Sequence, residues 1–265
     1  MRVPDNLSDV HLLLASVREA GTIARKYFQG DYKMWRKADG NPVTEADIEI
    51  DRYLKSALLA ARPDYGWLSE ETADDKVRLS RSRVFIVDPI DGTYGFLKHR
   101  PQFTIVAAVV EHGRPEAAII YNPITDEMFE AVHGAGARLN GSPICTSTTD
   151  QLEGSRLLAT RKLMETSSKP WPPLSVETRS SIAYRMALVA KGEFDAMISL
   201  SDKSEWDLAA GDLIVHEAKG RVTAQDGSKL IYNKAEPVHH GVICCAAPLY
   251  DELLSRLRDV PADFR

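Results

Sequence analysis

The sequence has few cysteines and no excess of basic residues. Three cysteines occur in 265 residues, and two of them, Cys244 and Cys245, are adjacent in the apolar stretch HGVICCAAP. This count and spacing exclude a disulfide framework and indicate buried thiols. The formal net charge is −5, whereas a surface that binds nucleic acid polymers needs a basic excess. We therefore expect no nucleic acid partner.

Long apolar runs are also missing. No stretch approaches the roughly 20 apolar residues that span a bilayer, and residues 1–10, MRVPDNLSDV, contain no apolar signal core. We expect a cytoplasmic protein without a membrane partner. The chain is long enough for one large domain or two small ones, and its hydrophobic content of 44% is ordinary for a globular protein.

The apolar spacing predicts two kinds of organisation along the chain. Helical spacing appears over residues 6–30 and 43–61, separated by a polar, turn-rich loop at 31–42. Strands are predicted from Val84 onward, with a hairpin formed by residues 103–110 and 116–122. Beyond about residue 143, strands (155–160, 194–200, 241–247) alternate with helices (179–192, 206–220, 249–259), and 167–175 is a proline-rich loop.

This pattern predicts an α/β protein, more closely a layered α+β sandwich of two subdomains. The expected subdomains are residues 1–143, which carry most of the acidic motifs, and residues 144–265, which contribute Asp207. A cleft between subdomains is a usual place for a ligand.

Four short stretches concentrate acidic residues. They are TEAD with Asp47, SEET with Glu70 and Glu71, DPIDGT with Asp88 and Asp91, and EWDLAAG with Asp207. Taken singly, most have a structural explanation. Asp47 and Asp207 each stand three residues after a Thr or Ser, as in a helix capping box, and the two glutamates fit an exposed pair after a turn.

Asp88 and Asp91 are harder to explain structurally. Asp88 ends an apolar strand, Pro89 imposes a bend, and Gly92 permits a backbone path that side chains forbid. Two aspartates three residues apart on such a turn repel each other unless a cation lies between them. The helix start predicted at GTYGFL would leave backbone N–H groups available to a phosphate.

The donor types select the cation. All candidate ligands are oxygen atoms, and the four stretches contain no histidine or cysteine. Such a set suits Mg²⁺, with Mn²⁺ or Ca²⁺ as substitutes, and does not suit Zn²⁺. Carboxylates that bridge two metal ions are a feature of two-metal phosphatases.

The four stretches together resemble the signature set of the inositol monophosphatase superfamily. Their order and spacing agree over the span from Asp47 to Gly211. The resemblance implies an αβαβα sandwich and a Mg²⁺-dependent, lithium-sensitive phosphomonoesterase, with two or three metal ions per site. It also implies the possibility of a homodimer.

The resemblance assigns metal ligands residue by residue. Glu70, Asp88 and the backbone carbonyl of Ile90 match ligands of the first metal ion. Asp88, Asp91 and Asp207 match ligands of the second. A third, weaker ion would share Glu70.

It also assigns catalytic and substrate-binding groups. Asp47 and Thr93 match the pair that orients and deprotonates the attacking water, and Glu70 is counted with them as a catalytic residue. The N–H groups of Gly92 and Thr93 match the phosphate cradle. Glu205, directly before Trp206, is expected on the substrate side.

The substrate is less clearly indicated. KSEWDLAAG, with Glu205, looks more like the bacterial 3'(2'),5'-bisphosphate nucleotidase branch, which implies adenosine 3',5'-bisphosphate as substrate; the alternative is an inositol-1-monophosphatase. Tyr94-Gly95 matches neither branch. The basic segment 98–100 could hold a second phosphate or be a solvated turn. An alternative of another class is a non-catalytic regulatory protein with the same fold.

Overall fold

The computed structural model describes residues 5–38, 40–166, 170–258 and 260. Its helices are α1 (Asp5–Phe28), α2 (Glu45–Ala61), α3 (Thr93–Leu97), α4 (Arg161–Thr166), α5 (Ile182–Ala190), α6 (Glu205–Glu217) and α7 (Tyr250–Arg258), with short 3-10 turns η1 (Val77–Ser80) and η2 (Ala247–Leu249). Its strands are β1 (Met34–Arg36), β2 (Pro42–Thr44), β3 (Gly66–Ser69), β4 (Arg83–Asp91), β5 (Thr104–Glu111), β6 (Arg114–Asn122), β7 (Glu127–Val132), β8 (Gly136–Leu139), β9 (Ser142–Pro143), β10 (Arg156–Leu158), β11 (Ser175–Glu177), β12 (Ala196–Ser204), β13 (Gly220–Thr223) and β14 (Val238–Ala246).

A seven-stranded sheet forms the first half of the described chain. Its order is β3-β4-β5-β6-β7-β8-β9. β3 and β4 are parallel, and every later pair is antiparallel. The predicted hairpin is confirmed, because β5 and β6 pair antiparallel across a tight turn, with Glu111 opposite Arg114.

Residues 84–87 of strand β4 are all apolar because both faces of the strand are buried there. Val84 and Ile86 pack into the core that β4 shares with α5 and α6, whereas Phe85 and Val87 pack on the opposite face with α1 and α2. Successive strand side chains point to opposite faces, so a strand covered on both sides gives a continuous hydrophobic run. The strand is therefore a rigid support for whatever its carboxyl end carries.

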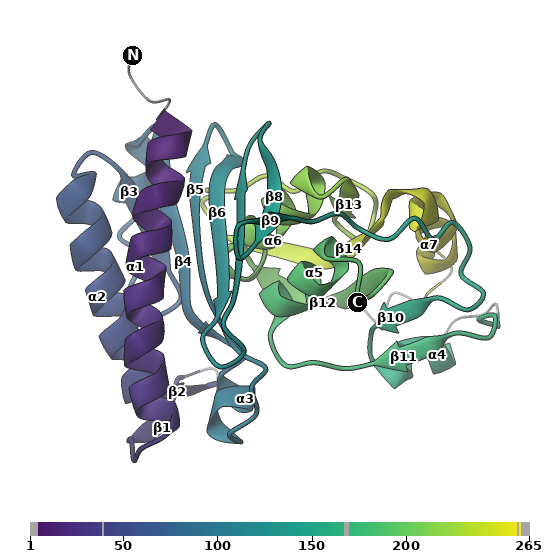
Figure 1. The fold of residues 1–265 in the computed structure, drawn as a ribbon, viewed down its shortest axis with the longest axis horizontal. Coiled ribbons are helices and arrows are strands. Elements are labelled where there is room, and N and C mark those ends of the chain that lie inside the picture. The colour runs from purple at the N-terminus through teal and green to yellow at the C-terminus, as the bar shows by residue number, and fades with distance from the viewer. Residues whose placement is uncertain (1–4, 39, 167–169, 259, 261–265) are drawn as a thin grey trace.

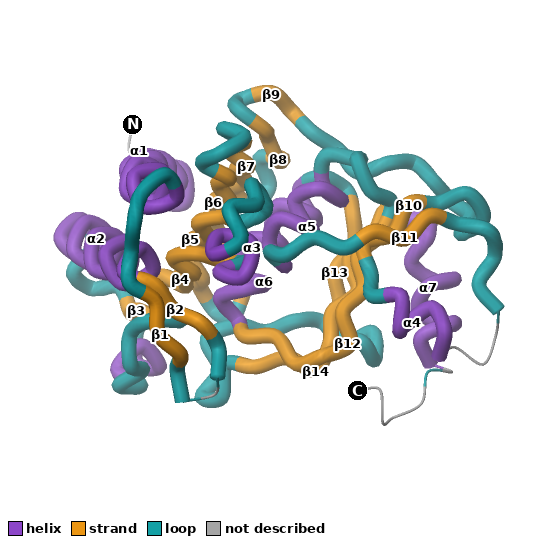
Figure 2. The backbone as a smooth tube through the Cα atoms, turned by 90° about the horizontal axis from the view of Figure 1, so that it is seen from below, coloured by secondary structure: helices purple, strands orange, loops and turns teal. Residues whose placement is uncertain are grey.

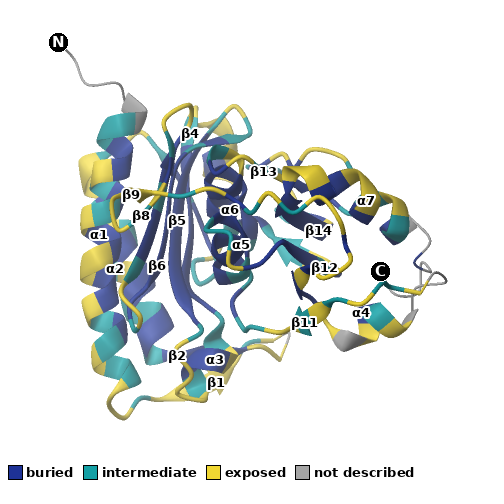
Figure 3. Ribbon diagram, turned by 45° about the vertical axis from the view of Figure 1, so that its right-hand side comes forward, coloured by how far each residue is buried: buried dark blue, intermediate teal, exposed yellow. Residues whose placement is uncertain are grey.

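A second sheet of five strands, β11-β10-β12-β14-β13, forms the other half. Helices α1 and α2 cover the outer face of the first sheet, α5 and α6 lie between the two sheets, and α7 covers the outer face of the second (Figures 1 and 2). Figure 3 shows α5 and α6 almost wholly buried, while α1 and α2 are exposed on one side. These layers confirm the predicted αβαβα sandwich.

Some local expectations were wrong. The loop predicted at 31–42 contains β1, which pairs antiparallel with β2 so that Trp35 lies opposite Val43. A three-residue ladder is too short to give an alternating pattern. The proline-rich loop at 167–175 ends in β11, its residues 167–169 lie outside the described residues, and the final helix is described to Arg258. The subdomain boundary near residue 143 stays a prediction.

The structure also describes the cysteines and the lengths of the helices. Cys244 and Cys245 are buried free thiols on β14, as predicted, and Cys145 is exposed. Within the described residues, the helices are too short or too polar to cross a bilayer.

Candidate active site

The carboxyl end of β4 carries two of the predicted metal ligands. The register between β4 and β5 shifts between Asp88, opposite Val106, and Asp91, opposite Thr104. Pro89 stands inside this irregularity, where it has no N–H to donate to the ladder. Such a bulge bends a strand and re-aims its side chains. The buried strand thus ends with both carboxylates directed into one space.

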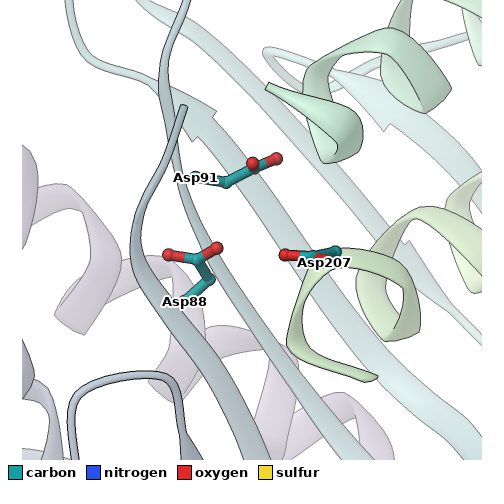
Figure 4. A group of neighbouring side chains, drawn as sticks. All are labelled: Asp88, Asp91 and Asp207. Atoms are coloured by element: carbon teal, nitrogen blue, oxygen red, sulfur yellow. The ribbon is translucent and has the colours of Figure 1, made fainter. Parts of the chain in front are cut away.

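The third ligand comes from the start of α6. One carboxylate oxygen from each of Asp88, Asp91 and Asp207 lies within 4.8 Å of the others. Figure 4 shows the three side chains converging, with Asp88 and Asp91 on one stretch of chain and Asp207 on the helix that faces it. The structure therefore gathers residues that are up to 119 positions apart, because α6 packs between the sheets and points its first turn at the end of β4.

Hydrogen bonds fix one oxygen of each carboxylate. Asp91 Oδ2 accepts from the Ser181 hydroxyl at 2.5 Å and from the N–H of Ala183 at 2.6 Å. Asp88 Oδ1 accepts from the N–H of Ile90 at 3.0 Å. Asp207 Oδ2 accepts from the N–H of Ser204 at 3.0 Å, as a capping residue does. The other oxygens can therefore serve as ligands in fixed positions.

The three aspartates are electrostatically unfavourable to one another. Burial raises the pKa of Asp88 and Asp207 well above the usual range, and neighbouring carboxylates raise both further. Burial also raises the pKa of Asp91, although its hydrogen bonds to Ser181 and the α5 backbone oppose this rise. Buried carboxylates are stabilised in their charged form by a nearby positive charge, and a divalent cation is the strongest such charge.

Asp47 and Thr93 lie next to this group. The Thr93 hydroxyl is 3.5 Å from Asp47 Oδ1 and 3.2 Å from the Ile90 carbonyl oxygen. Asp47 Oδ2 accepts instead from the N–H and hydroxyl of Thr44, at 2.8 and 2.5 Å, which forms the predicted capping box. Burial raises the pKa of Asp47 to about 6. One oxygen thus anchors α2 while the other faces Thr93.

Glu70 lines the same cavity but is held by a cation that the sequence did not indicate. Lys37 Nζ lies 2.7 Å from Glu70 Oε1 and 2.7 Å from Glu71 Oε1. Burial raises the pKa of Glu71 to about 7, while the bond to Lys37 opposes this rise. The Glu70–Glu71 pair is therefore linked to the β1–β2 segment and is not the exposed pair that its turn position suggested.

These groups border one open cavity of about 400 Å³. The residues that line it come from both halves of the chain: Asn41, Pro42, Glu70, Asp88, Ile90, Asp91, Gly92, Thr93, Tyr94, Ser180, Arg185 and Asp207. Asp47 contacts the cavity through Thr93. A larger cavity of about 840 Å³, lined by residues such as His239 and Lys234, contains none of these carboxylates. We take the smaller one as the candidate active site because it holds the carboxylates.

Glu205 does not reach this cavity. Its side chain is fully buried, and its carboxylate accepts from the N–H groups of Asn233 at 2.6 Å and Lys234 at 3.0 Å. Two residues along a helix turn by about 200°, so Glu205 and Asp207 point to different sides of α6. The expected substrate contact is corrected: Glu205 fixes the 233–234 segment.

Sequence reasoning missed Ser181 and Arg185. Ser181 is the N-cap of α5 and accepts from the N–H of Tyr184 at 2.8 Å, so a serine before an apolar helix was a usable signal. Arg185 lies one turn further on, and nothing in the helical pattern showed which surface it would meet.

The donor set fits a divalent metal ion. The side chains of Asp88, Asp91, Asp207 and Glu70 offer only oxygen atoms, and Ile90 lines the same cavity, with its carbonyl oxygen 3.2 Å from the Thr93 hydroxyl. Among the described residues, no ammonium or guanidinium is hydrogen-bonded to Asp88, Asp91 or Asp207. Such a site suits Mg²⁺ or a similar hard cation.

Comparisons with known proteins agree with this geometry. The model of the inositol monophosphatase family matches residues 6–260. The chain is 29% identical to the inositol-1-monophosphatase of Rhizobium meliloti (strain 1021), over 95% of both chains, and 31% identical to the histidinol-phosphatase of Chlorobaculum parvum, over 84% of this chain and 91% of that protein. The structure of an IMPase from Thermotoga maritima superposes with a TM-score of 0.85 at 26% identity, covering 97% of this chain and 100% of that one.

The match extends over nearly the whole chain, and its ordered motifs converge on one acidic cavity. The chain belongs to the inositol monophosphatase family.

Proposed function

We propose that the protein is a Mg²⁺-dependent phosphomonoesterase that hydrolyses a small phosphorylated metabolite with an activated water. The observation that carries the proposal is the convergence of Asp88, Asp91 and Asp207 beside the Asp47–Thr93 pair in one cavity. Carboxylates grouped for metal ions next to a proton acceptor are the parts that direct hydrolysis of a phosphate ester requires.

The proposed metal ligands are those that the resemblance to the family implies. Glu70, Asp88 and the Ile90 carbonyl would hold a first ion, and Asp88, Asp91 and Asp207 a second; a third would share Glu70. When bound, Mg²⁺ would lower the pKa of a water molecule and would neutralise the charge that develops on the phosphoryl group and the leaving oxygen. Mn²⁺ is the expected substitute and Li⁺ the expected inhibitor.

We assign proton transfer to Asp47 and Thr93. The Thr93 hydroxyl can accept a hydrogen bond from a water on the cavity side while it donates to Asp47 Oδ1. Asp47, with a pKa of about 6, is mainly ionised at neutral pH and can take the proton as a general base. The capping bonds from Thr44 to Oδ2 keep the accepting oxygen in place.

We propose that the phosphate binds at the start of α3. Gly92 adopts φ +95°, a conformation that glycine accepts readily, and it turns the chain from β4 into α3. A Cβ atom at Gly92 would lie 3.0 Å from the carbonyl oxygen of Gln102 and from the backbone nitrogen of Ser181. The N–H groups of Gly92 and Thr93, at the edge of the same cavity, would donate to the phosphate.

For the substrate we propose adenosine 3',5'-bisphosphate, which makes the protein a 3'(2'),5'-bisphosphate nucleotidase. The support is the segment before Asp207, KSEWDLAAG, although its Glu205 acts structurally. Inositol 1-phosphate is the second candidate, favoured by the name of the R. meliloti relative. A homodimer stays a proposal.

A panel of phosphate-release assays tests these proposals. We expect release from adenosine 3',5'-bisphosphate to exceed release from inositol 1-phosphate with Mg²⁺ and to cease with EDTA. The reverse order would favour an inositol-1-monophosphatase. Absence of release from both and from p-nitrophenyl phosphate would contradict the enzymatic proposal and favour a non-catalytic regulatory protein of the same fold.

A further inference from the structure

One wall of the candidate active site carries an arginine that the proposed hydrolysis does not use. Arg185 lies in the first turns of α5 and lines the cavity together with Asp91 and Asp207. It is bonded to the segment that contains Ser180, and Ser180 and Tyr94 also line the cavity. The metal ions, the water and the proton acceptor proposed above do not use Arg185, so its guanidinium is available to another part of the substrate.

The guanidinium is held in a defined orientation. Nε donates to the carbonyl oxygen of Arg179 at 2.6 Å, and Nη2 donates to the carbonyl oxygen of Ser180 at 3.2 Å. In the described part of the chain, Nη1 donates to no protein acceptor, and the guanidinium forms no ion pair with a carboxylate. An arginine fixed through one edge has its other edge available for an oxyanion.

Helix stability does not explain this residue. A cation in the first turns of a helix is disfavoured by the helix dipole, and Arg185 is the fourth helical residue after the N-cap Ser181. Burial lowers the pKa of Arg185, and this opposes its charge, while Asp91 favours it. A partly buried cation at an unfavourable helix position indicates a role outside the helix.

The unusual Tyr94-Gly95 pair helps to form this wall. A Cβ atom at Gly95 would lie 2.9 Å from the carbonyl oxygen of Gln102, 3.0 Å from Ser180 Oγ and 3.1 Å from Ser180 Cβ. These distances are shorter than van der Waals contact, so a larger residue would displace the Ser180 segment. Since the Ser180 carbonyl holds the guanidinium, Gly95 permits the position of Arg185.

We propose that Arg185 binds a second anionic group on the leaving part of the substrate. The substrate class is then phosphomonoesters whose leaving group carries a further phosphate or a similar oxyanion. This inference rests on the proposed phosphatase function and names a specificity residue for it. Segment 98–100, the other basic candidate, is exposed and does not line the cavity.

The test compares two substrates with the same scissile ester. Adenosine 3',5'-bisphosphate carries a second phosphate, and adenosine 3'-monophosphate does not. We expect Arg185→Gln to reduce the ratio of their kcat/KM values by about 10- to 100-fold, mainly through KM for the bisphosphate, because a charge-assisted hydrogen bond is lost. Arg185→Lys should restore part of the ratio, since it keeps the charge. Arg100→Gln, the matched control, should leave the ratio unchanged.

An equal effect of Arg185→Gln on both substrates would overturn the proposal, because a purely structural arginine would act on both alike. Calorimetric binding of the two nucleotides in Ca²⁺ provides a readout that needs no turnover. If wild type hydrolyses nothing but binds the bisphosphate more tightly, and Arg185→Gln abolishes this preference, the phosphatase proposal fails while the Arg185 assignment stands. If wild type hydrolyses both nucleotides and Arg185→Gln keeps the preference, the Arg185 assignment fails alone. Binding of neither nucleotide would overturn both.

Discussion

The two walls of the cavity differ in how firmly they are built. The carboxylate wall comes from the end of a strand buried on both faces and from a helix packed between two sheets, and hydrogen bonds fix each aspartate. The other wall comes from the loop before α5, from Arg185 in α5 and from Tyr94 in the short α3. Tyr94 is exposed, and Arg185 is held by two backbone carbonyls. The carboxylate wall is rigid and suits chemistry that the family shares. The other wall, which we call the loop-built wall, suits selection of a substrate.

The largest effect should follow from damage to the carboxylate wall. Asp88→Asn removes a charge that both proposed metal positions share, so we expect Mg²⁺-dependent phosphate release to fall by about 10³-fold or more. The matched control, Asp202→Asn, changes an exposed aspartate that contacts His240 and should retain activity. Circular dichroism checks that Asp88→Asn folds; a folded variant with wild-type activity would refute the metal assignment.

Thr93→Ala tests the proton path between Asp47 and the proposed water. Loss of the hydroxyl leaves Asp47 in place through its capping bonds but removes its link to the water, so kcat should fall by about 10²-fold with a smaller change in KM. Steady-state kinetics separate the two parameters. A rise in KM with kcat unchanged would assign Thr93 to substrate binding.

Metal binding should stabilise the carboxylate wall in a pH-dependent manner. At a concentration of about 100 times its Kd, Mg²⁺ should add about 2.7 kcal/mol to the free energy of unfolding. This corresponds to a rise in Tm of roughly 5–10 °C for a chain of this size. The folded pKa values of Asp88, Asp91, Asp207 and Asp47 are raised. An acid whose pKa is higher in the folded than in the unfolded protein stabilises the metal-free fold at pH values below the unfolded pKa, which lies near 4. This stabilisation is lost as the pH rises through the folded pKa.

Protons therefore compete with Mg²⁺ at low pH. The Mg²⁺-induced rise in Tm should be greatest near pH 8 and smaller at pH 5, as thermal unfolding with Mg²⁺ or EDTA can show. Asp88→Asn should lose most of the rise at both values. A rise that is equal at the two pH values would show that the raised carboxylates are not the ligands.

The smallest effect concerns the loop-built wall. Gly95→Ala should shift the Ser180 segment and reduce the preference for adenosine 3',5'-bisphosphate over adenosine 3'-monophosphate by about tenfold or less, with Mg²⁺ dependence kept. Gly30→Ala is a control at an exposed glycine that does not line the cavity, where a Cβ would meet only the carbonyl oxygen of Lys26, at 3.2 Å. An unchanged preference would separate Gly95 from the placement of Arg185.

The same contrast decides what could be predicted from the sequence. Asp88, Asp91 and Asp207 stand in ordered motifs next to strong strand and helix signals, so both their elements and their convergence could be anticipated. Glu205 was assigned from its nearness to Asp207 in the chain, but the helical rotation between the two residues turns it into the core.

Other contacts depend on tertiary packing alone. Lys37 meets Glu70 across 33 residues of chain, from a segment whose short strand gives no pattern. Arg185 reaches the cavity because α5 packs between the sheets and because Gly95 makes room for the Ser180 segment. Local propensities do not encode either of these contacts, so the positions of Lys37 and Arg185 at the cavity could be found only from the structure.

Anomalous diffraction from crystals grown with Mn²⁺ can show whether the converged aspartates hold catalytic metal. We expect anomalous peaks coordinated by Asp88, Asp91 and Asp207, with a further peak at Glu70, and loss of the peak shared by Asp88 in Asp88→Asn crystals. Well-ordered aspartates without an anomalous peak at saturating Mn²⁺, or a peak only at residues outside this cavity, would refute the metal site.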